Sequence, residues 1–302
     1  LSTGGNTVVF GNADSGKETL LSTVVYDIMT THTAEEVQLY LLDFGSEALK
    51  IFKESPNVGD VVFINDVEKL SRLFDMLQKE IKDRKAILSE YNGDYNLYLQ
   101  KSKESMPMLV IIINNYEAFS ENYEDDYEDT LQMLTREGIK CGITFLITAN
   151  THNDIRYRLA QNFKQTIALQ LNNEDDYYNI FEKVGKKRPS PIFGRGLLDI
   201  IDGEIYEFQT AKICEPENWN LHIKETNEKL KEKNKTTAKP IPVLPNRVTW
   251  EDVENSFTDL TTVPIGIAKK SLTVFTYDFT KNFIHIITSK NIEDSIEFTL
   301  HI

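Results

Sequence analysis

Two short segments of the chain, "MLVIII" (residues 108–113) and "GITFLIT" (residues 142–148), are apolar almost throughout. A strand with one face in water alternates apolar and polar side chains, whereas a strand covered on both faces does not. Strands of the second kind occur in parallel sheets, whose connecting helices cover both faces. The two segments therefore predict the centre of a largely parallel sheet.

Other strand-like runs alternate with helical ones over roughly the first two hundred residues. The runs are "TVVF" (residues 7–10), "VQLYLLDF" (37–44), "DVVFI" (60–64) and "QTIALQL" (165–171), and residues 67–91 carry apolar residues at helical spacing. This order predicts an α/β fold in which helices flank a parallel sheet in three αβα layers. "GLLDII" and "EIYEF" then predict a hairpin that turns at Asp202 and Gly203.

The character of the sequence changes after Phe208, and three segments are predicted. Residues 1–212 form the α/β domain, residues 213–245 a polar helix and a proline-rich linker, and residues 246–302 a small β-rich extension. Within the extension we expect a short helix and then strands at residues 271–279, 282–288 and 295–300. The extension is either the stump of a further repeat or a set of strands that caps the edge of the sheet.

The charge of the chain argues against a protein whose task is to grip nucleic acid. It contains 33 Lys and Arg but 47 Asp and Glu, a net charge of −14, whereas nucleic-acid-binding proteins concentrate basic residues. The 2 cysteines and 5 histidines are scattered, so neither a disulfide framework nor a metal site is expected. No apolar run approaches the roughly 20 residues of a membrane span. Because the chain starts at Leu1 without a methionine, we read it as a piece of a longer protein.

The stretch "GNADSGKET" (residues 11–19) lies between a predicted strand and a predicted helix and has the G-x-x-x-x-G-K pattern of a phosphate-binding loop. In such a loop the glycines let backbone N–H groups face the phosphates, and the lysine neutralises phosphate oxygens. Glu18 departs from the pattern, because a Ser or Thr that binds Mg²⁺ normally follows the lysine. Glu18 and Asp14 bring negative charge to the loop, so nucleotide without a metal ion should bind poorly. The predicted nucleotide-binding residues are Gly11, Asn12, Ala13, Asp14, Ser15, Gly16, Lys17, Glu18 and Thr19.

A strand beside such a loop normally ends in two acidic residues, one for Mg²⁺ and one for the attacking water. Here the strand "MLVIII" is followed by Asn114 and Asn115. An amide carries no negative charge and accepts no proton, and the loss of a general base typically slows a reaction by about 10²–10⁴-fold. We therefore expect no intact catalytic residue and no metal ligands of the protein's own. Glu117 is either a substitute base or a surface residue after the strand.

The order of these motifs resembles that of the FtsK/SpoIIIE-type ATPase modules of the type VII secretion coupling ATPases, the EssC/EccC family. The resemblance covers about residues 5–212 and runs through "VVFGNADSGKETLL", "YLLDFGSEALK", "MLVIIINNYEAF", "GITFLITANTHNDIRYRLAQNF", "FGRGLL" and "EIYEFQTA". It implies a RecA-like P-loop fold, and it places Asn150 where active relatives sense the γ-phosphate. It also implies that Arg156 or Arg158 reaches a neighbouring module, unless surface salt bridges use these side chains.

The resemblance further implies a cellular role. Members of the family are bacterial membrane proteins with several cytoplasmic ATPase modules in tandem, which export small helical proteins of the WXG100 class. The degenerate loop and the two amides are most similar to the third, C-terminal module, where substrate docking and regulation of the motor are placed. The expected partners are neighbouring ATPase modules, WXG100-class substrates and other components of the secretion system, with no nucleic acid. The expected location is the cytoplasmic side of the cell membrane.

Three functions stay open on the sequence alone. The first is a regulatory and substrate-docking module that binds ATP weakly, with or without Mg²⁺, and hydrolyses little or none of it. The second is an active ATP-driven motor or DNA translocase that uses Glu117 or a residue of a neighbour. The third is a structural module whose nucleotide site stays empty. The missing acids and the negative charge favour the first and the third.

Overall fold

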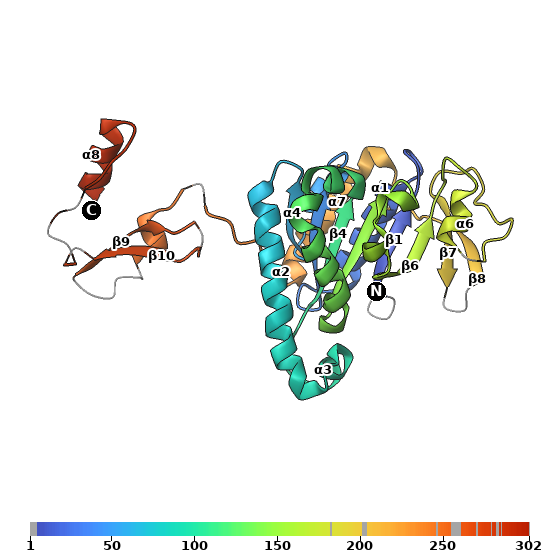
Figure 1. Ribbon diagram of the computed structural model, residues 1–302, viewed down its shortest axis with the longest axis horizontal. Helices are drawn as coiled ribbons and strands as arrows, with labels where there is room; N and C mark the ends of the chain where they lie inside the picture. The colour runs from blue at the N-terminus through green and yellow to red at the C-terminus, as the bar shows by residue number, and fades with distance from the viewer. Residues whose placement is uncertain are drawn as a thin grey trace. The chain divides into compact units, whose positions relative to one another are not determined.

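The computed structural model describes residues 5–181, 183–200, 204–245, 247–254, 261–269, 271–278, 280–281, 284 and 286–301 of the chain (Figure 1). Residue contacts divide it into two compact units, Leu1–Ile241 and Pro242–Ile302. The first unit contains an eight-stranded sheet, and the second contains a two-stranded one. Among the described residues, no helix combines the length and the apolar character that crossing a bilayer requires.

The sheet of the first unit has the strand order β3-β2-β4-β5-β1-β6-β7-β8. The strands from β3 to β6 run parallel to one another, and β7 and β8 are antiparallel. Every residue of β4 and β5 is buried, and both strands lie inside the sheet as the apolar segments predict. The strands are β1 (Asn6–Phe10), β2 (Val37–Asp43), β3 (Val58–Phe63), β4 (Met108–Asn114), β5 (Ile143–Ala149), β6 (Phe163–Ala168), β7 (Arg195–Ile200) and β8 (Glu204–Gln209).

Helices flank this sheet, since strands buried along their whole length need apolar neighbours on each face. The helices α2 and α4 pack together through aromatic rings, with the centroids of Phe74 and Phe119 6.2 Å apart. The helices α1 and α7 meet where Tyr26 and His222 share a hydrogen bond of 2.9 Å. The predicted fold of a largely parallel sheet between helices is thus confirmed. The helices are α1 (Lys17–Thr31), α2 (Val67–Leu88), α3 (Tyr95–Lys101), α4 (Tyr116–Glu137), α5 (Tyr157–Ala160), α6 (Asp176–Ile180) and α7 (Trp219–Lys233).

The strands β7 and β8 form the predicted hairpin, paired from Arg195 opposite Gln209 to Ile200 opposite Glu204. The predicted turn at residues 202 and 203 lies outside the described residues. Because β7 runs antiparallel to β6, the start of β7 lies at the edge of the sheet where the parallel strands end. This carboxyl edge of the sheet is where the polar residues of the candidate site gather.

The second unit, Pro242–Ile302, contains a two-stranded antiparallel sheet and one regular α-helix among its described residues. β9 (Thr262–Ile267) pairs with β10 (Val274–Asp278), which agrees with the strand predicted at residues 271–279. The short helix expected before the strands is a single turn at Trp250–Asp252. The boundary predicted at residue 212 stays a prediction, and the helix α7 beyond it belongs to the first unit.

The strand predicted at residues 295–300 is wrong, because these residues belong to the helix α8 (Ile292–His301). Asn291 starts this helix, and its side-chain oxygen accepts a hydrogen bond from the N–H of Glu293 at 3.3 Å. Ile292 and Ile296 are spaced four residues apart, as neighbours on one helical face are. A local capping signal therefore outweighs the strand-like composition.

The strand predicted at residues 282–288 is also not found in its described part. Residues 284 and 286–288 belong to no strand, and residues 282, 283 and 285 lie outside the described residues. Ile284 and Ile286 are 80% and 82% exposed. An apolar run needs a sheet on which to pack before it becomes a strand.

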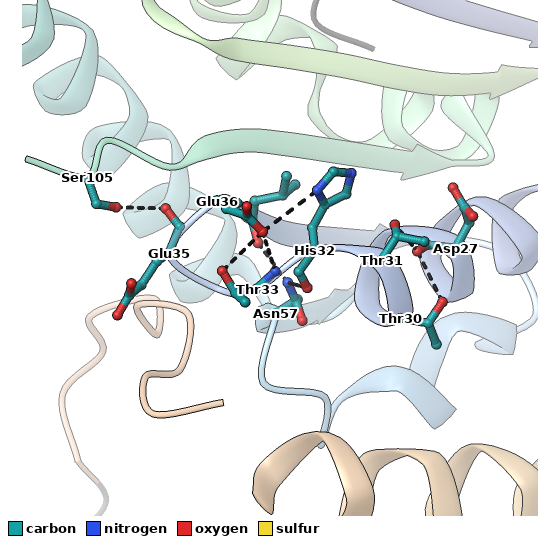
Figure 2. Close-up of polar contacts among 10 residues, drawn as sticks. Asp27, Thr30, Thr31, His32, Thr33, Glu35, Glu36, Asn57 and Ser105 are labelled. Carbon is teal, nitrogen blue, oxygen red and sulfur yellow. Dashed lines mark hydrogen bonds and ion pairs between the residues drawn. The ribbon is translucent and has the colours of Figure 1, made fainter. Parts of the chain in front are cut away.

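Polar contacts fix the connection between α1 and β2, as Figure 2 shows. The N–H of Thr33 donates to Glu36 Oε2 at 2.8 Å, and this bond lowers the pKa of Glu36. Asn57, fully buried just before β3, donates from Nδ2 to the carbonyl oxygens of His32 at 3.1 Å and Val37 at 3.0 Å. These bonds hold the carboxyl end of α1, the helix whose other end carries the predicted loop.

Replacement of Asn57 with alanine is expected to lower the free energy of unfolding by about 2 kcal/mol, because the buried bond to the Val37 carbonyl and the partly buried bond to the His32 carbonyl are both lost. Urea unfolding followed by circular dichroism measures the change. Thr31→Ala is the matched control, since Thr31 belongs to the same connection and its side chain is exposed. The control should change the free energy by less than about 0.5 kcal/mol, and equal losses in the two variants would contradict the role given to Asn57.

Candidate functional site

The loop between β1 and α1 is held in shape by close contact with the segment before β7. Gly16 has a φ of 101°, and a Cβ atom at this position would lie 2.9 Å from the Cα atom of Gly194. The N–H of Gly194 donates to the carbonyl oxygen of Ser15 at 3.0 Å. Only glycine fits position 16, because both the left-handed backbone and the close approach exclude a side chain. The "FGRGLL" segment thus supports the loop from the β7 side.

Lys17, the first residue of α1, directs its ammonium group back into the loop. Its Nζ atom donates to the carbonyl oxygens of Gly11 and Asn12, the latter at 3.0 Å, and to Asn150 Oδ1 at 2.9 Å. Burial lowers the pKa of Lys17, and nearby carboxylates partly counteract this effect. A half-buried cation is therefore held at the centre of the loop by neutral oxygen atoms that an anion can displace.

Asn150, directly after β5, connects Lys17 to Glu117. Its Nδ2 atom donates to Glu117 Oε2, while its backbone N–H donates to Asp154 Oδ2 at 2.8 Å. Glu117 lies in the first turn of α4, is exposed to solvent and also lines the cavity of the site. Its position is thus compatible with both interpretations, a surface residue and a substitute base. It is exposed, and it accepts a hydrogen bond from Asn150, the residue that also contacts Lys17.

Asn114, at the end of β4, is buried in a network with two neighbouring strands. Its Nδ2 atom donates to Asp43 Oδ1 at 2.9 Å, and its Oδ1 atom accepts from Thr148 Oγ1 at 3.0 Å. Asp43 is 1% exposed and also accepts a hydrogen bond from the N–H of Leu49 at 2.8 Å. The amide at position 114 therefore supplies the donor that a buried carboxylate requires. An acid at this position would place two carboxylates in contact.

Asn115 serves a different structural purpose from Asn114. Its N–H donates to Thr148 Oγ1 at 2.8 Å, and its side-chain oxygen caps α4 by accepting from the N–H of Ala118 at 3.4 Å. Its backbone is left-handed, with a φ of 65°, a conformation that asparagine tolerates better than most residues. Both amides are thus engaged within the chain.

Glu18 directs its carboxylate toward the segment that follows β2. Its Oε1 atom accepts a hydrogen bond from Ser46 Oγ at 2.5 Å. A Cβ atom on Gly45 would lie 3.6 Å from this oxygen and 3.7 Å from Asp43 Oδ1. Two carboxylates therefore flank Gly45. Among the described residues, no cluster of three or more His, Cys, Asp or Glu side chains is arranged to hold a metal ion.

A cavity of about 430 Å³ lies among these residues at the carboxyl edge of the sheet. It brings together most of the predicted loop, both amides and Asn150. Gly11 and Ser15 shape the loop without lining the cavity, and Ser15 Oγ donates to the carbonyl oxygen of Asn12 at 2.9 Å. Five of the lining residues are not among those predicted from the sequence, namely Gly45, Ser46, Thr148, Ala149 and Phe193. The lining residues are Asn12, Ala13, Asp14, Gly16, Lys17, Glu18, Thr19, Gly45, Ser46, Asn114, Asn115, Glu117, Thr148, Ala149, Asn150 and Phe193.

Arg156 forms ion pairs within the chain. Its guanidinium group lies 2.9 Å from Glu124 Oε2 and also pairs with Glu128, both on α4. Of the two uses considered for this side chain, the structure shows the surface salt bridge.

The parallel sheet, the glycine-lysine loop between its central strand and a helix, and the polar strand ends beside that loop define a P-loop α/β protein. Residues 1–196 match the profile of the FtsK/SpoIIIE family, and the chain belongs to this family.

The chain is similar to proteins of bacterial secretion systems. The type VII secretion system protein EssC of Staphylococcus aureus (strain MRSA252) is 25% identical over 293 residues, which are 93% of this chain and 20% of the relative. The ESX secretion system protein EccC of Geobacillus thermodenitrificans is 25% identical over 275 residues, 89% of this chain and 18% of the relative. The chain thus spans about a fifth of the length of these curated relatives.

Solved structures share the fold. The structure of EssC (ATPases 2 and 3) from Geobacillus thermodenitrificans has a TM-score of 0.83 at 24% identity, over 93% of this chain and 55% of that one. Thermomonospora curvata EccC (ATPases 2 and 3), in complex with a signal sequence peptide, has a TM-score of 0.71 at 24% identity, over 93% of this chain and 52% of that one. These similarities confirm the P-loop ATPase architecture.

The substitution Asn114→Asp is expected to destabilise the protein by about 3 kcal/mol at neutral pH, because two buried carboxyl groups in contact do not both ionise. The folded pair then keeps a proton that the unfolded chain releases. The loss of stability should therefore grow as the pH rises from about 4.5 to 7.

Urea unfolding at the two pH values measures this loss. Asn115→Asp is the comparison variant, because an aspartate still caps α4 and Asn115 has no bond to Asp43 among the contacts described. It loses the hydrogen bond from Asn115 Nδ2 to the carbonyl oxygen of Phe44, so its pH dependence and not its total loss is compared. A loss in Asn114→Asp that does not change with pH would contradict the carboxyl-pair account.

Proposed function

We propose that the chain is a degenerate ATPase module of a membrane-anchored type VII secretion motor. In this role it binds nucleotide with little or no hydrolysis and acts in the docking of WXG100-class substrates and in regulation of their export. One observation carries the proposal: Lys17 occupies a formed phosphate-binding loop, beside strand ends that carry Asn114 and Asn115 where hydrolysis needs acids. Phosphate binding needs a cation and backbone N–H groups, which the Lys17 loop supplies. Hydrolysis also needs an acidic residue, and positions 114 and 115 carry amides instead.

When phosphate binds, the ammonium group of Lys17 exchanges its carbonyl acceptors for phosphate oxygens. The ammonium of Lys17 leaves the carbonyl oxygens of Gly11 and Asn12 and pairs with phosphate oxygens, and the amino end of α1 adds its positive dipole. The bond from Lys17 to Asn150 is exchanged at the same time, while Asn150 keeps its bond to Glu117. Nucleotide thereby changes the hydrogen bonds that connect the loop to β5 and α4.

The site suits a phosphate chain better than a bound Mg²⁺ ion. Position 18 lacks the hydroxyl that holds the metal in such loops, and the Glu18 carboxylate bonds to Ser46 instead. Two unit charges about 5 Å apart repel by roughly 3 kcal/mol at an effective dielectric constant of 20. Glu18 and Asp14, which both line the cavity, therefore weaken the binding of a polyphosphate, and we expect weak affinity for ATP.

Similarity to secretion ATPases supports the cellular part of the proposal. The relatives are named as type VII and ESX secretion proteins, and the solved structures hold two ATPases of one chain or a whole cytoplasmic domain. One of them holds a signal sequence peptide. Neighbouring ATPase modules, exported substrates and other secretion components are the proposed partners, on the cytoplasmic side of the bacterial membrane. The degenerate loop and amides favour the third, C-terminal module.

An active motor is a second candidate, favoured by the position of Glu117. This carboxylate lines the cavity and accepts a hydrogen bond from Asn150, so it is placed to take a proton from water beside a bound phosphate. Translocation of DNA is disfavoured by the net charge of −14. A third candidate is a structural module whose loop binds no nucleotide.

Calorimetric titration of the chain with ATP and Mg²⁺ is expected to show weak binding that Lys17→Ala abolishes, with no phosphate release above background. A parallel titration adds the C-terminal tail of a candidate WXG100-class substrate, which should bind whether or not Lys17 is present. Turnover that Lys17→Ala and Glu117→Gln both abolish would establish the active motor instead. If millimolar ATP does not bind and the substrate tail still does, the third candidate, a structural module without nucleotide, would be supported.

The affinity of the site for phosphate is expected to fall as the pH rises. The fall should begin at a lower pH than it would if Lys17 had the ordinary lysine pKa of 10.5. Burial lowers the pKa of Lys17, so the neutral amine forms at lower pH and the phosphates lose their counter-charge. Titrations with inorganic tripolyphosphate between about pH 8 and 10 measure the decline. Lys17→Arg is the control, since arginine stays charged over this range. If the unmodified chain and Lys17→Arg lose affinity over the same pH range, groups other than Lys17 cause the loss.

A further inference from the structure

The aromatic ring of Phe193 is exposed to solvent beside the loop, although hydrogen bonds hold the backbone of this segment. Its side chain lines the cavity and is 51% exposed. The carbonyl oxygen of Phe193 accepts from Gln209 Nε2 at 2.9 Å, and the next residue, Gly194, donates to Ser15 at 3.0 Å. The backbone that carries this large apolar ring is thereby held at the rim of the cavity, and the ring itself lies outside the core.

Phe193 and the two amides lie on opposite sides of the loop. In the strand order β4-β5-β1-β6-β7, Asn114 ends the strand two places to one side of β1, and Phe193 precedes the strand two places to the other side. All of these positions belong to the carboxyl edge of the sheet, since β7 starts where β6 ends. An elongated ligand whose terminal phosphate faces Asn114 and Asn150 therefore extends toward Phe193 at its other end.

We infer that Phe193 is the stacking platform for the base of a bound nucleotide, an inference that rests on the proposed nucleotide-binding function. The face of an aromatic side chain pairs well with the flat face of a nucleobase, and every base presents such a face. Stacking on Phe193 makes the site one for nucleoside phosphates rather than for bare phosphate. Stacking alone tolerates any base, so the site distinguishes ATP from GTP poorly.

Comparison of ATP with inorganic tripolyphosphate isolates the contribution of the base. In calorimetric titrations at one fixed Mg²⁺ concentration, the unmodified chain should bind ATP more tightly than tripolyphosphate. Phe193→Ala should weaken ATP by about five- to tenfold and leave the tripolyphosphate affinity within about twofold, because a stacked base loses roughly this much when its aromatic partner is removed. Phe193→Trp should keep the preference for ATP.

Ile192→Ala is the matched control. Ile192 is the adjacent residue, is 47% exposed and does not line the cavity. The control should change neither affinity, and thermal unfolding of each variant verifies that the loop support is intact.

The possible outcomes separate the inference from the function on which it rests. If Phe193→Ala weakens ATP and tripolyphosphate equally, or weakens neither, the stacking platform is refuted while phosphate binding at the loop stands. If neither ligand binds to the unmodified chain, both the inference and the nucleotide-binding function fail. A preference of ATP over GTP of more than about tenfold would show that groups other than Phe193 recognise the base.

Discussion

The hydrogen bond between the Asp43 carboxylate and the Asn114 amide joins the ends of two central strands in the interior of the protein. Asp43 is 1% and Asn114 3% exposed, so neither group has water to satisfy it. Thr148 on β5 completes the network, and the three side chains fix the polar edge against which the loop lies. An acidic residue at position 114 would break this arrangement, because a carboxylate already lies on the neighbouring strand.

This network changes the meaning of a degenerate ATPase motif. Judged from the motif, Asn114 and Asn115 are places where acids are missing. In the structure Asn114 donates a hydrogen bond to the buried carboxylate of Asp43, and Asn115 caps the helix α4. Glu18 likewise bonds to Ser46 across the site. Each residue that departs from the motif thus has a hydrogen-bond partner within the chain.

The sequence predicted the parts of the fold that depend on neighbours along the chain. Apolar runs located β4 and β5, and the glycine-lysine spacing located the loop, because burial on both faces and tight turns leave local signals. Gly45, Ser46, Thr148, Ala149 and Phe193 lie within segments that carry the family resemblance, but their approach to the loop depends on the strand order, which the segments taken singly do not predict. The C-terminal strand predicted at residues 295–300 failed because a cap at Asn291 favoured a helix, a signal that composition alone concealed.

Gly194 meets the loop through main-chain atoms, because its N–H donates to the carbonyl oxygen of Ser15 at 3.0 Å and it leaves no space for a side chain on Gly16. Side chains can change rotamer and absorb a small displacement, but two touching backbones cannot. The start of the β7–β8 hairpin and the loop therefore pack against each other through their backbones. A displacement of Gly194 would accordingly have to be matched by Ser15 and Gly16, the residues that shape the turn into α1.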